Sequence, residues 1–191
     1  MKRTAVVNAS VAFTFAALVL LLCGRGLAAD ADYYARCNLK VLKGNKVTWL
    51  NWQASPTFIP AGTKLKVSKS GAKATLTDPA GEQYTLDIGS AGEKYLEKFV
   101  TQKPLNIDKY PKDVQEGIRE AVARLDMTKE QVYVAMGPPV KLLSGDTETT
   151  TYEQIMGSNN WIYARRRMGK NIGVEFDPTT GKVIRTEGIW R

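Results

Sequence analysis

Histidine is missing from all 191 residues, and this absence removes most of the familiar kinds of catalytic site. Neither a Ser-His-Asp nor a Cys-His arrangement can be assembled, and a zinc site would lose its usual nitrogen ligand. No glycine-rich loop has the spacing that phosphate binding requires. The composition therefore indicates a protein that is not an enzyme and that carries neither a metal nor another cofactor.

Paired carboxylates are the chemistry that remains, because two acids can flank a glycosidic bond and act as acid and base. Glu175 and Asp177 alternate onto one face of a predicted strand, and Glu148 and Glu153 lie in the same half of the chain. Acidic side chains are also the ordinary occupants of a strand face that meets water. We favour the solvated face over a hydrolase site.

A more promising group for binding is the set Trp161, Tyr163, Arg165 and Arg167, which share one face of a predicted strand. Aromatic residues and arginine are enriched in protein interfaces, and a guanidinium can also hold a carboxylate or phosphate with two hydrogen bonds. These four residues are our predicted partner-binding site. The alternative places the two aromatic rings in the core under the helices, with the arginines at the wet end of the strand.

Short strands separated by turns are predicted for residues 30–102. Residues 46–52 have strand-forming side chains on both faces, and residues 64–68 alternate between apolar and polar. Proline and glycine have turn spacing at residues 59–62 and 78–81. This pattern predicts a small β-barrel domain. A helix would close the barrel on one side, with the helical spacing of Tyr95, Leu96, Phe99 and Val100.

After a linker at residues 103–111, which contains two prolines, the apolar residues change to a helical period. The first stripe consists of Val114, Ile118, Ala121, Val122 and Leu125. A second helix is predicted to begin at Thr128, where Gln131 completes a capping box, and to end at Gly137.

Strands are predicted around residues 149–155, 161–168, 172–176 and 182–186, and residues 177–181 connect the last two. Two helices followed by an antiparallel sheet make an ααβββ module over residues 112–191. The predicted fold class of the whole chain is therefore α+β, with a small N-terminal β-barrel before this module.

The module resembles the SmpA/OmlA (BamE-like) family of outer-membrane assembly lipoproteins over residues 112–188. The resemblance is carried by Ile118, Met127-Thr128, Val132, Gly137-Pro138-Pro139, Trp161-Ile162-Tyr163, Val174-Glu175-Phe176 and Gly181-Lys182-Val183. It implies a non-enzymatic envelope protein that binds other proteins. The family usually has glycine where this chain has Asp126, and it usually carries a lipidated N-terminal cysteine. The first half resembles the bacterial Src-homology-type barrels of envelope proteins through residues 58–67.

Residues 1–29 have the order of a secretory signal peptide, with a basic start, an apolar run and then small residues. A permanent membrane anchor is the alternative, but polar residues interrupt the apolar run. Cys23 follows Leu22, which disfavours lipidation. Cleavage removes three basic residues and no acidic one, so the mature chain stays basic, although its charge drops from the +8 of the whole chain.

Cys37 is the one cysteine that remains after cleavage, so it can be a free thiol, a buried apolar residue or a link between two chains. We expect a periplasmic or outer-membrane-associated protein without a lipid anchor, with an envelope protein as its partner. Peptidoglycan or an anionic lipid is the alternative partner, bound by the N-terminal barrel. Export disfavours nucleic acid.

Overall fold

The computed structural model describes residues 32–48, 57–164 and 171–188. Helices and strands are mixed in these residues, and the strands form two separate sheets, so the predicted α+β class is confirmed. Residues 1–29 and the tryptophans at 49 and 52 lie outside the described residues. In the described part of the chain, no helix has the length and apolar character that crossing a bilayer requires.

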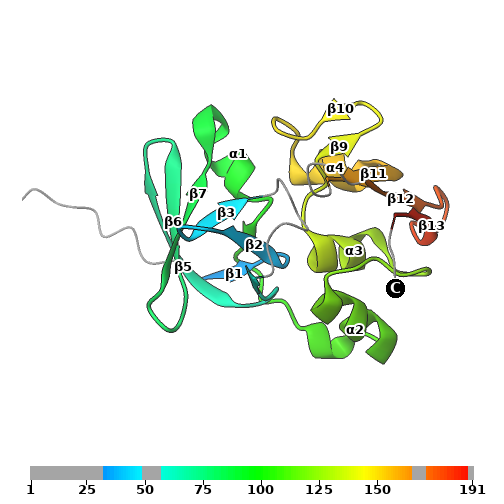
Figure 1. Ribbon diagram of the computed structural model, residues 1–191, viewed down its shortest axis with the longest axis horizontal. Coiled ribbons are helices and arrows are strands. Elements are labelled where there is room, and N and C mark those ends of the chain that lie inside the picture. The colour runs from blue at the N-terminus through cyan, green and yellow to red at the C-terminus, as the bar shows by residue number, and fades with distance from the viewer. Residues whose placement is uncertain (1–31, 49–56, 165–170, 189–191) are drawn as a thin grey trace, which may run out of the picture.

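Among the described residues the first sheet has eight strands, and Figure 1 shows that it is strongly curled. Their order is β4-β2-β3-β7-β6-β5-β1-β8, and all neighbours are antiparallel except β3 and β7. Leu65, Leu76 and Leu86 fill the inside, which follows from the alternation of apolar and polar residues. The strands are β1 (Tyr33–Ala35), β2 (Leu39–Leu42), β3 (Lys46–Thr48), β4 (Thr57–Ile59), β5 (Lys64–Ser70), β6 (Lys73–Thr77), β7 (Gln83–Asp87) and β8 (Val100–Thr101).

The predicted closing helix is shorter than its apolar spacing indicated. Helix α1 spans Glu93–Leu96, and the chain then enters strand β8 at Val100. Tyr95, Leu96 and Phe99 are nevertheless buried, as predicted. Val100 pairs with Ala35 of β1, so the backbone here is hydrogen-bonded to that strand instead of continuing the helix.

In the part of the chain that the structure describes, the second sheet has five strands in the order β10-β9-β11-β12-β13. All of its neighbouring strands are antiparallel, as predicted for this half. The strands are β9 (Lys141–Leu142), β10 (Gly145–Asp146), β11 (Asn160–Tyr163), β12 (Ile172–Phe176) and β13 (Val183–Glu187).

Helix α2 (Lys112–Glu120) ends earlier than the apolar stripe predicted. Ala121 adopts a left-handed conformation with φ 55°, and this residue terminates the helix although it is not glycine. As a result Leu125 falls beyond the helix and is exposed rather than buried.

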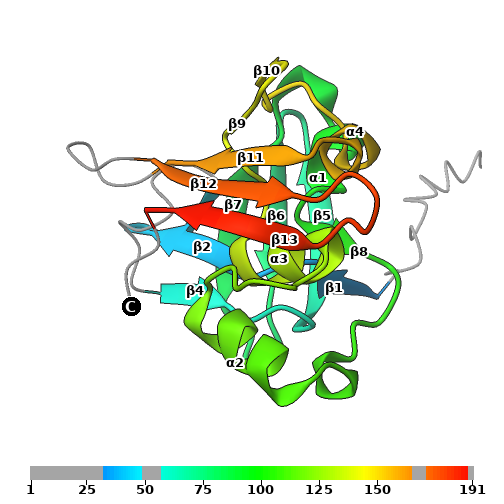
Figure 2. The ribbon, with the colours of Figure 1, turned by 90° about the vertical axis from the view of Figure 1, so that its right-hand side faces the viewer.

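Helix α3 (Lys129–Met136) lies between the two sheets (Figures 1 and 2). The predicted capping box of Thr128 and Gln131 is present, and Gly137 ends the helix with φ 78°. Every residue from Val132 to Met136 is buried, because one side of the helix meets the first sheet and the other side meets the second. The core is therefore continuous through both halves of the molecule.

The strand predicted around residues 149–155 is wrong, because helix α4 (Tyr152–Gly157) occupies that place. Its N-terminus carries a second capping box, in which the Thr151 hydroxyl accepts a hydrogen bond from the Gln154 amide. This Thr-x-x-Gln spacing is the same signal that the sequence offers at Thr128.

Candidate functional site

Two of the four residues of the predicted partner-binding site are core residues. Trp161 is 0% exposed and Tyr163 is 1% exposed. The indole of Trp161 donates to the Ile155 carbonyl at 3.1 Å, and the Tyr163 hydroxyl donates to the Gly137 carbonyl at 3.1 Å. The prediction that these rings face a partner is wrong, since they point to the side of the sheet that α3 covers. Arg165 and Arg167 lie outside the described residues.

Instead, a chain of aromatic rings leads from Trp161 to a charged group at the surface. Tyr133 of α3 makes edge-to-face contacts with Trp161, at 6.0 Å between centroids, and with Tyr152, at 5.0 Å. The Arg36 guanidinium then lies over the Tyr152 ring, 4.2 Å from its centroid. Such stacking of a cation on an aromatic face is favourable, so the second half of the molecule fixes the position of an arginine from the first half.

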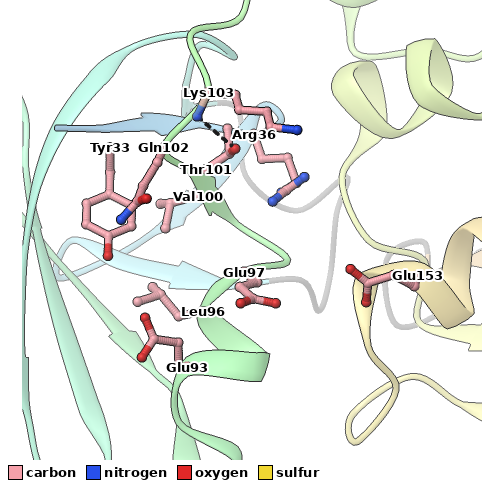
Figure 3. Close-up of a pocket in the computed structure, with 10 residues that line it drawn as sticks. All are labelled: Tyr33, Arg36, Glu93, Leu96, Glu97, Val100, Thr101, Gln102, Lys103 and Glu153. Atoms are coloured by element: carbon pink, nitrogen blue, oxygen red, sulfur yellow. Dashed lines mark hydrogen bonds between the residues drawn. The ribbon is translucent and has the colours of Figure 1, made fainter. Parts of the chain in front are cut away.

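Arg36 lies in a cleft of about 410 Å³ between the two halves, which we call the junction cleft (Figure 3). Its volume falls in the range of about 300–1,000 Å³ that is usual for ligand sites. Residues of β1, α1, β8 and α4 line it, and the residues that matter here are Tyr33, Arg36, Glu97, Gln102, Lys103 and Glu153.

The charge of Arg36 is incompletely paired. Among the described residues, no carboxylate forms an ion pair with its guanidinium, and its Nε is buried without a hydrogen-bond partner. In Figure 3 the guanidinium faces the space between Glu97 on the α1 side and Glu153 on α4. Both glutamates are exposed, and no ion pair to either is present in the described part of the chain.

Asn38, two residues after Arg36, holds the two halves together and is 3% exposed. Its side-chain amide donates to the carbonyls of Ile118 at 2.7 Å and Ala135 at 2.9 Å. Its side-chain carbonyl accepts from the Ala61 amide at 3.0 Å. One buried side chain thus joins α2, α3 and the turn at Ala61.

Lys98, next to Glu97, makes a second buried link and is 2% exposed. Its ammonium donates to the carbonyls of Thr147 at 2.6 Å and Glu148 at 2.9 Å. Burial lowers the pKa of Lys98 to about 8. The Lys98 carbonyl in turn accepts from the Tyr133 hydroxyl at 2.9 Å, so this residue binds both α3 and the loop before α4.

Cys37 precedes Asn38 in the chain, contacts Lys98 and is buried. Its sulfur is 4.0 Å from the Lys98 carbonyl oxygen, and burial raises the pKa of the thiol to about 12. A side chain at Gly137 would meet this sulfur at 3.3 Å, so the close approach of α3 needs glycine there. Of the three interpretations that the sequence left open for Cys37, the structure has the buried apolar residue.

The carboxylates that the sequence singled out do not come together as a catalytic pair. Glu175 forms an ion pair with Arg185 at 2.8 Å on the outer face of the second sheet. Asp177 accepts hydrogen bonds from the backbone and hydroxyl of Thr180, which lower the pKa of its carboxyl group. A general acid needs a raised pKa, so Asp177 has the opposite property.

Glu153 is the one predicted carboxylate that lines the junction cleft. The sequence did not single out Arg36, Glu97 or the cleft itself. Arg36 and Glu153 are far apart in the chain, and no local motif marks residues that meet only when two halves pack. The sequence offered one signal that the two halves pack together, the fully apolar run at residues 132–136. Such a run is typical of a helix that is buried on all sides.

Comparisons with models of protein families, with curated proteins and with solved structures find no match. The resemblance to the SmpA/OmlA family therefore stays a prediction. Within the described ranges, no group of three or more histidine, cysteine, aspartate and glutamate residues could hold a metal ion.

Proposed function

We propose that this chain is a non-enzymatic protein of the bacterial envelope that binds another protein, and that the junction cleft is where it does so. The observation that carries the proposal is Arg36. Its guanidinium is held in place by Tyr152, points into a cleft and has no ion-pair partner in the described residues. A preorganised and partly desolvated arginine is the kind of residue that dominates binding energy in interfaces.

The same proposal includes the arrangement of domains and the role of the family. In it, the chain has a small β-barrel at residues 30–102, a linker at 103–111 and an SmpA/OmlA-like ααβββ module at 112–191. This module would serve outer-membrane assembly or maintenance. Asp126 supports the comparison with that family, because its φ of 63° is a conformation that favours glycine, the family's usual residue at this place. Aspartate tolerates this conformation better than most residues.

Pull-down from envelope extracts tests the binding proposal. Glu153→Lys places a positive charge beside Arg36, and recovery of the partner should fall at least about tenfold. Asp113→Lys is the matched control, since Asp113 is also exposed and also lies in the first turn of its helix. Equal recovery by both variants would show that the partner does not use the cleft.

The proposed export includes cleavage of the signal peptide, after residue 29 or residue 31. Mass spectrometry of the protein from its natural envelope should find an N-terminus at Asp30 or Asp32. A lipid-modified Cys23 would contradict this part of the proposal and would favour the tethered role of the family.

Peptidoglycan is the second candidate partner, because the cleft carries charges of both signs. Three glutamates line the cleft beside one arginine and one lysine, which disfavours an anionic lipid surface. Cosedimentation of the full-length mature protein with purified peptidoglycan, lost in Glu153→Lys and kept in Asp113→Lys, would favour this candidate over a protein partner.

A further inference from the structure

We infer that the junction cleft recognises an extended protein segment carrying an acidic and a basic side chain on the same face. The acidic side chain pairs with Arg36, and the basic side chain lies between Glu97 and Glu153. This inference rests on the proposed function, because it names the chemistry of the partner at the same cleft.

The charges of the cleft walls argue for both signs in one ligand. Arg36 faces Glu97 and Glu153, and no ion pair joins it to either in the described residues. The cleft therefore presents a cation and two anions that do not neutralise one another. The third glutamate, Glu93, is already paired with Lys69 at 3.1 Å. An anionic ligand alone would be repelled by the two glutamates, and a cationic ligand alone by Arg36. A ligand with one group of each sign complements both.

The edge of the first sheet argues for an extended segment. Strand β8 is the last strand in the order, and it pairs with β1 on one side through Val100 and Thr101. In the described part of the chain no strand pairs with its other side. An open edge offers backbone groups to an incoming strand, and side chains two residues apart in that strand share a face.

Short labelled peptides with neutral, capped ends test the inference by fluorescence anisotropy. Each has a Thr-Val background and a central Glu-Thr-Lys, Lys-Thr-Glu, Glu-Thr-Glu, Lys-Thr-Lys or Gln-Thr-Gln. Wild-type protein should bind one of the two mixed peptides at least about tenfold more tightly than the Gln-Thr-Gln peptide, which corresponds to roughly 1.4 kcal/mol. It should bind Glu-Thr-Glu and Lys-Thr-Lys more weakly than that mixed peptide.

Charge reversal supplies the decisive control. In the double variant Glu97→Lys and Glu153→Lys, preference should move to the Glu-Thr-Glu peptide, a change that loss of structure would not produce. Both glutamates are exposed, so thermal unfolding should confirm that the variant folds. Asp113→Lys should keep the wild-type preference.

Equal affinity for all five peptides, or a preference unchanged by the double reversal, would overturn the inference. If the pull-down depends on Glu153 while the peptides show no charge preference, the inference fails and the proposed function stands. If the pull-down does not depend on Glu153, the proposed function fails first. If the protein cosediments with peptidoglycan and binds none of the five peptides, the inference is also overturned.

Discussion

Three consecutive residues, Arg36, Cys37 and Asn38, lie where the two halves of this molecule meet. Arg36 contacts Tyr152 and Asn38 contacts Ile118, both in the second half of the chain. Cys37, between them, contacts the carbonyl of Lys98. The sequence offered two environments for Trp161 and Tyr163, exposed or buried, because alternation tells which residues share a face but not which face is covered. The helix that covers them, α3, is separated from strand β11 in the sequence by β9, β10 and α4, so no local pattern shows that the two elements pack together.

Cys37 should be inert in the folded protein. Because burial raises the pKa of the thiol to about 12, very little thiolate forms near neutral pH, and thiolate is the reactive species. A thiol reagent such as Ellman's should label the native mature protein far more slowly than the protein in urea. Rapid native labelling, or a disulfide-linked dimer on non-reducing gels, would contradict the buried environment.

Lys98 should make stability depend on pH in the alkaline range. Its folded pKa of about 8 is below the ordinary 10.5, so between these values the unfolded chain holds more protons. Stability from this residue must therefore rise as pH rises through that window. The free energy of unfolding of wild type, minus that of Lys98→Met, should be larger at pH 9.5 than at pH 7.

Comparison with this variant cancels the other groups that titrate in the same window. Lys40 has a pKa lowered to about 8 by burial and acts in the same direction, whereas Cys37 opposes both above pH 9. A difference that stays constant with pH would mean that Lys98 is not buried in solution.

At the scale of the elements, the sequence was most informative where a local chemical signal marks an end. The capping box at Thr128, the glycine after Met136 and the turn at residues 177–181 were predicted and are present. Strands β5 and β12 also lie where alternation or apolar runs placed them. Errors arose where two signals compete: residues 149–155 contain β-branched residues that favour strand, but the cap at Thr151 begins a helix.

The C-terminal end of α2 and the turn after it could not be predicted, because Ala121 and Asp126 adopt left-handed conformations without being glycine. Only packing of the neighbouring elements can hold such residues there. Backbone groups on either side of Asp126 are used, since its amide donates to the Val183 carbonyl at 3.0 Å and the Val183 amide donates to Met127.

Asp126→Gly should therefore stabilise the protein. Glycine adopts φ 63° without the steric cost of a side chain, and the expected gain is about 1 kcal/mol in the free energy of unfolding. Urea denaturation measures the change, with the exposed Asp113→Gly, inside α2, as a control that should destabilise. A loss of stability in Asp126→Gly would mean that the Asp126 side chain makes a stabilising contact.

At the scale of the whole molecule, the two halves share one core around α3. The sequence predicted two units joined by a linker at residues 103–111, and apolar periodicity cannot show whether such units pack together. The buried groups of Asn38 and Lys98, each bonded across the junction, are what bind the two sheets to the same helix and loop.

Asn38→Ala should weaken the whole molecule rather than one half. It removes three hydrogen bonds of the Asn38 side chain, to the buried carbonyls of Ile118 and Ala135 and from the amide of Ala61, at a cost of about 3 kcal/mol, although the Ile118 carbonyl still accepts from the Ala121 amide. Unfolding followed by far-ultraviolet circular dichroism and by tryptophan fluorescence should still give one coincident transition, shifted to lower urea. Two separated transitions would show that the halves fold independently.

The central claim is that the partner is bound at the junction cleft, and site-specific photo-crosslinking in intact cells tests it most directly. A photoreactive residue at Gln102 or Glu153, both in the cleft, should form a crosslink to one defined protein. The same residue at Glu187, on the outer face of the second sheet, should form none. A partner captured from Glu187 and not from Gln102 or Glu153 would contradict the account.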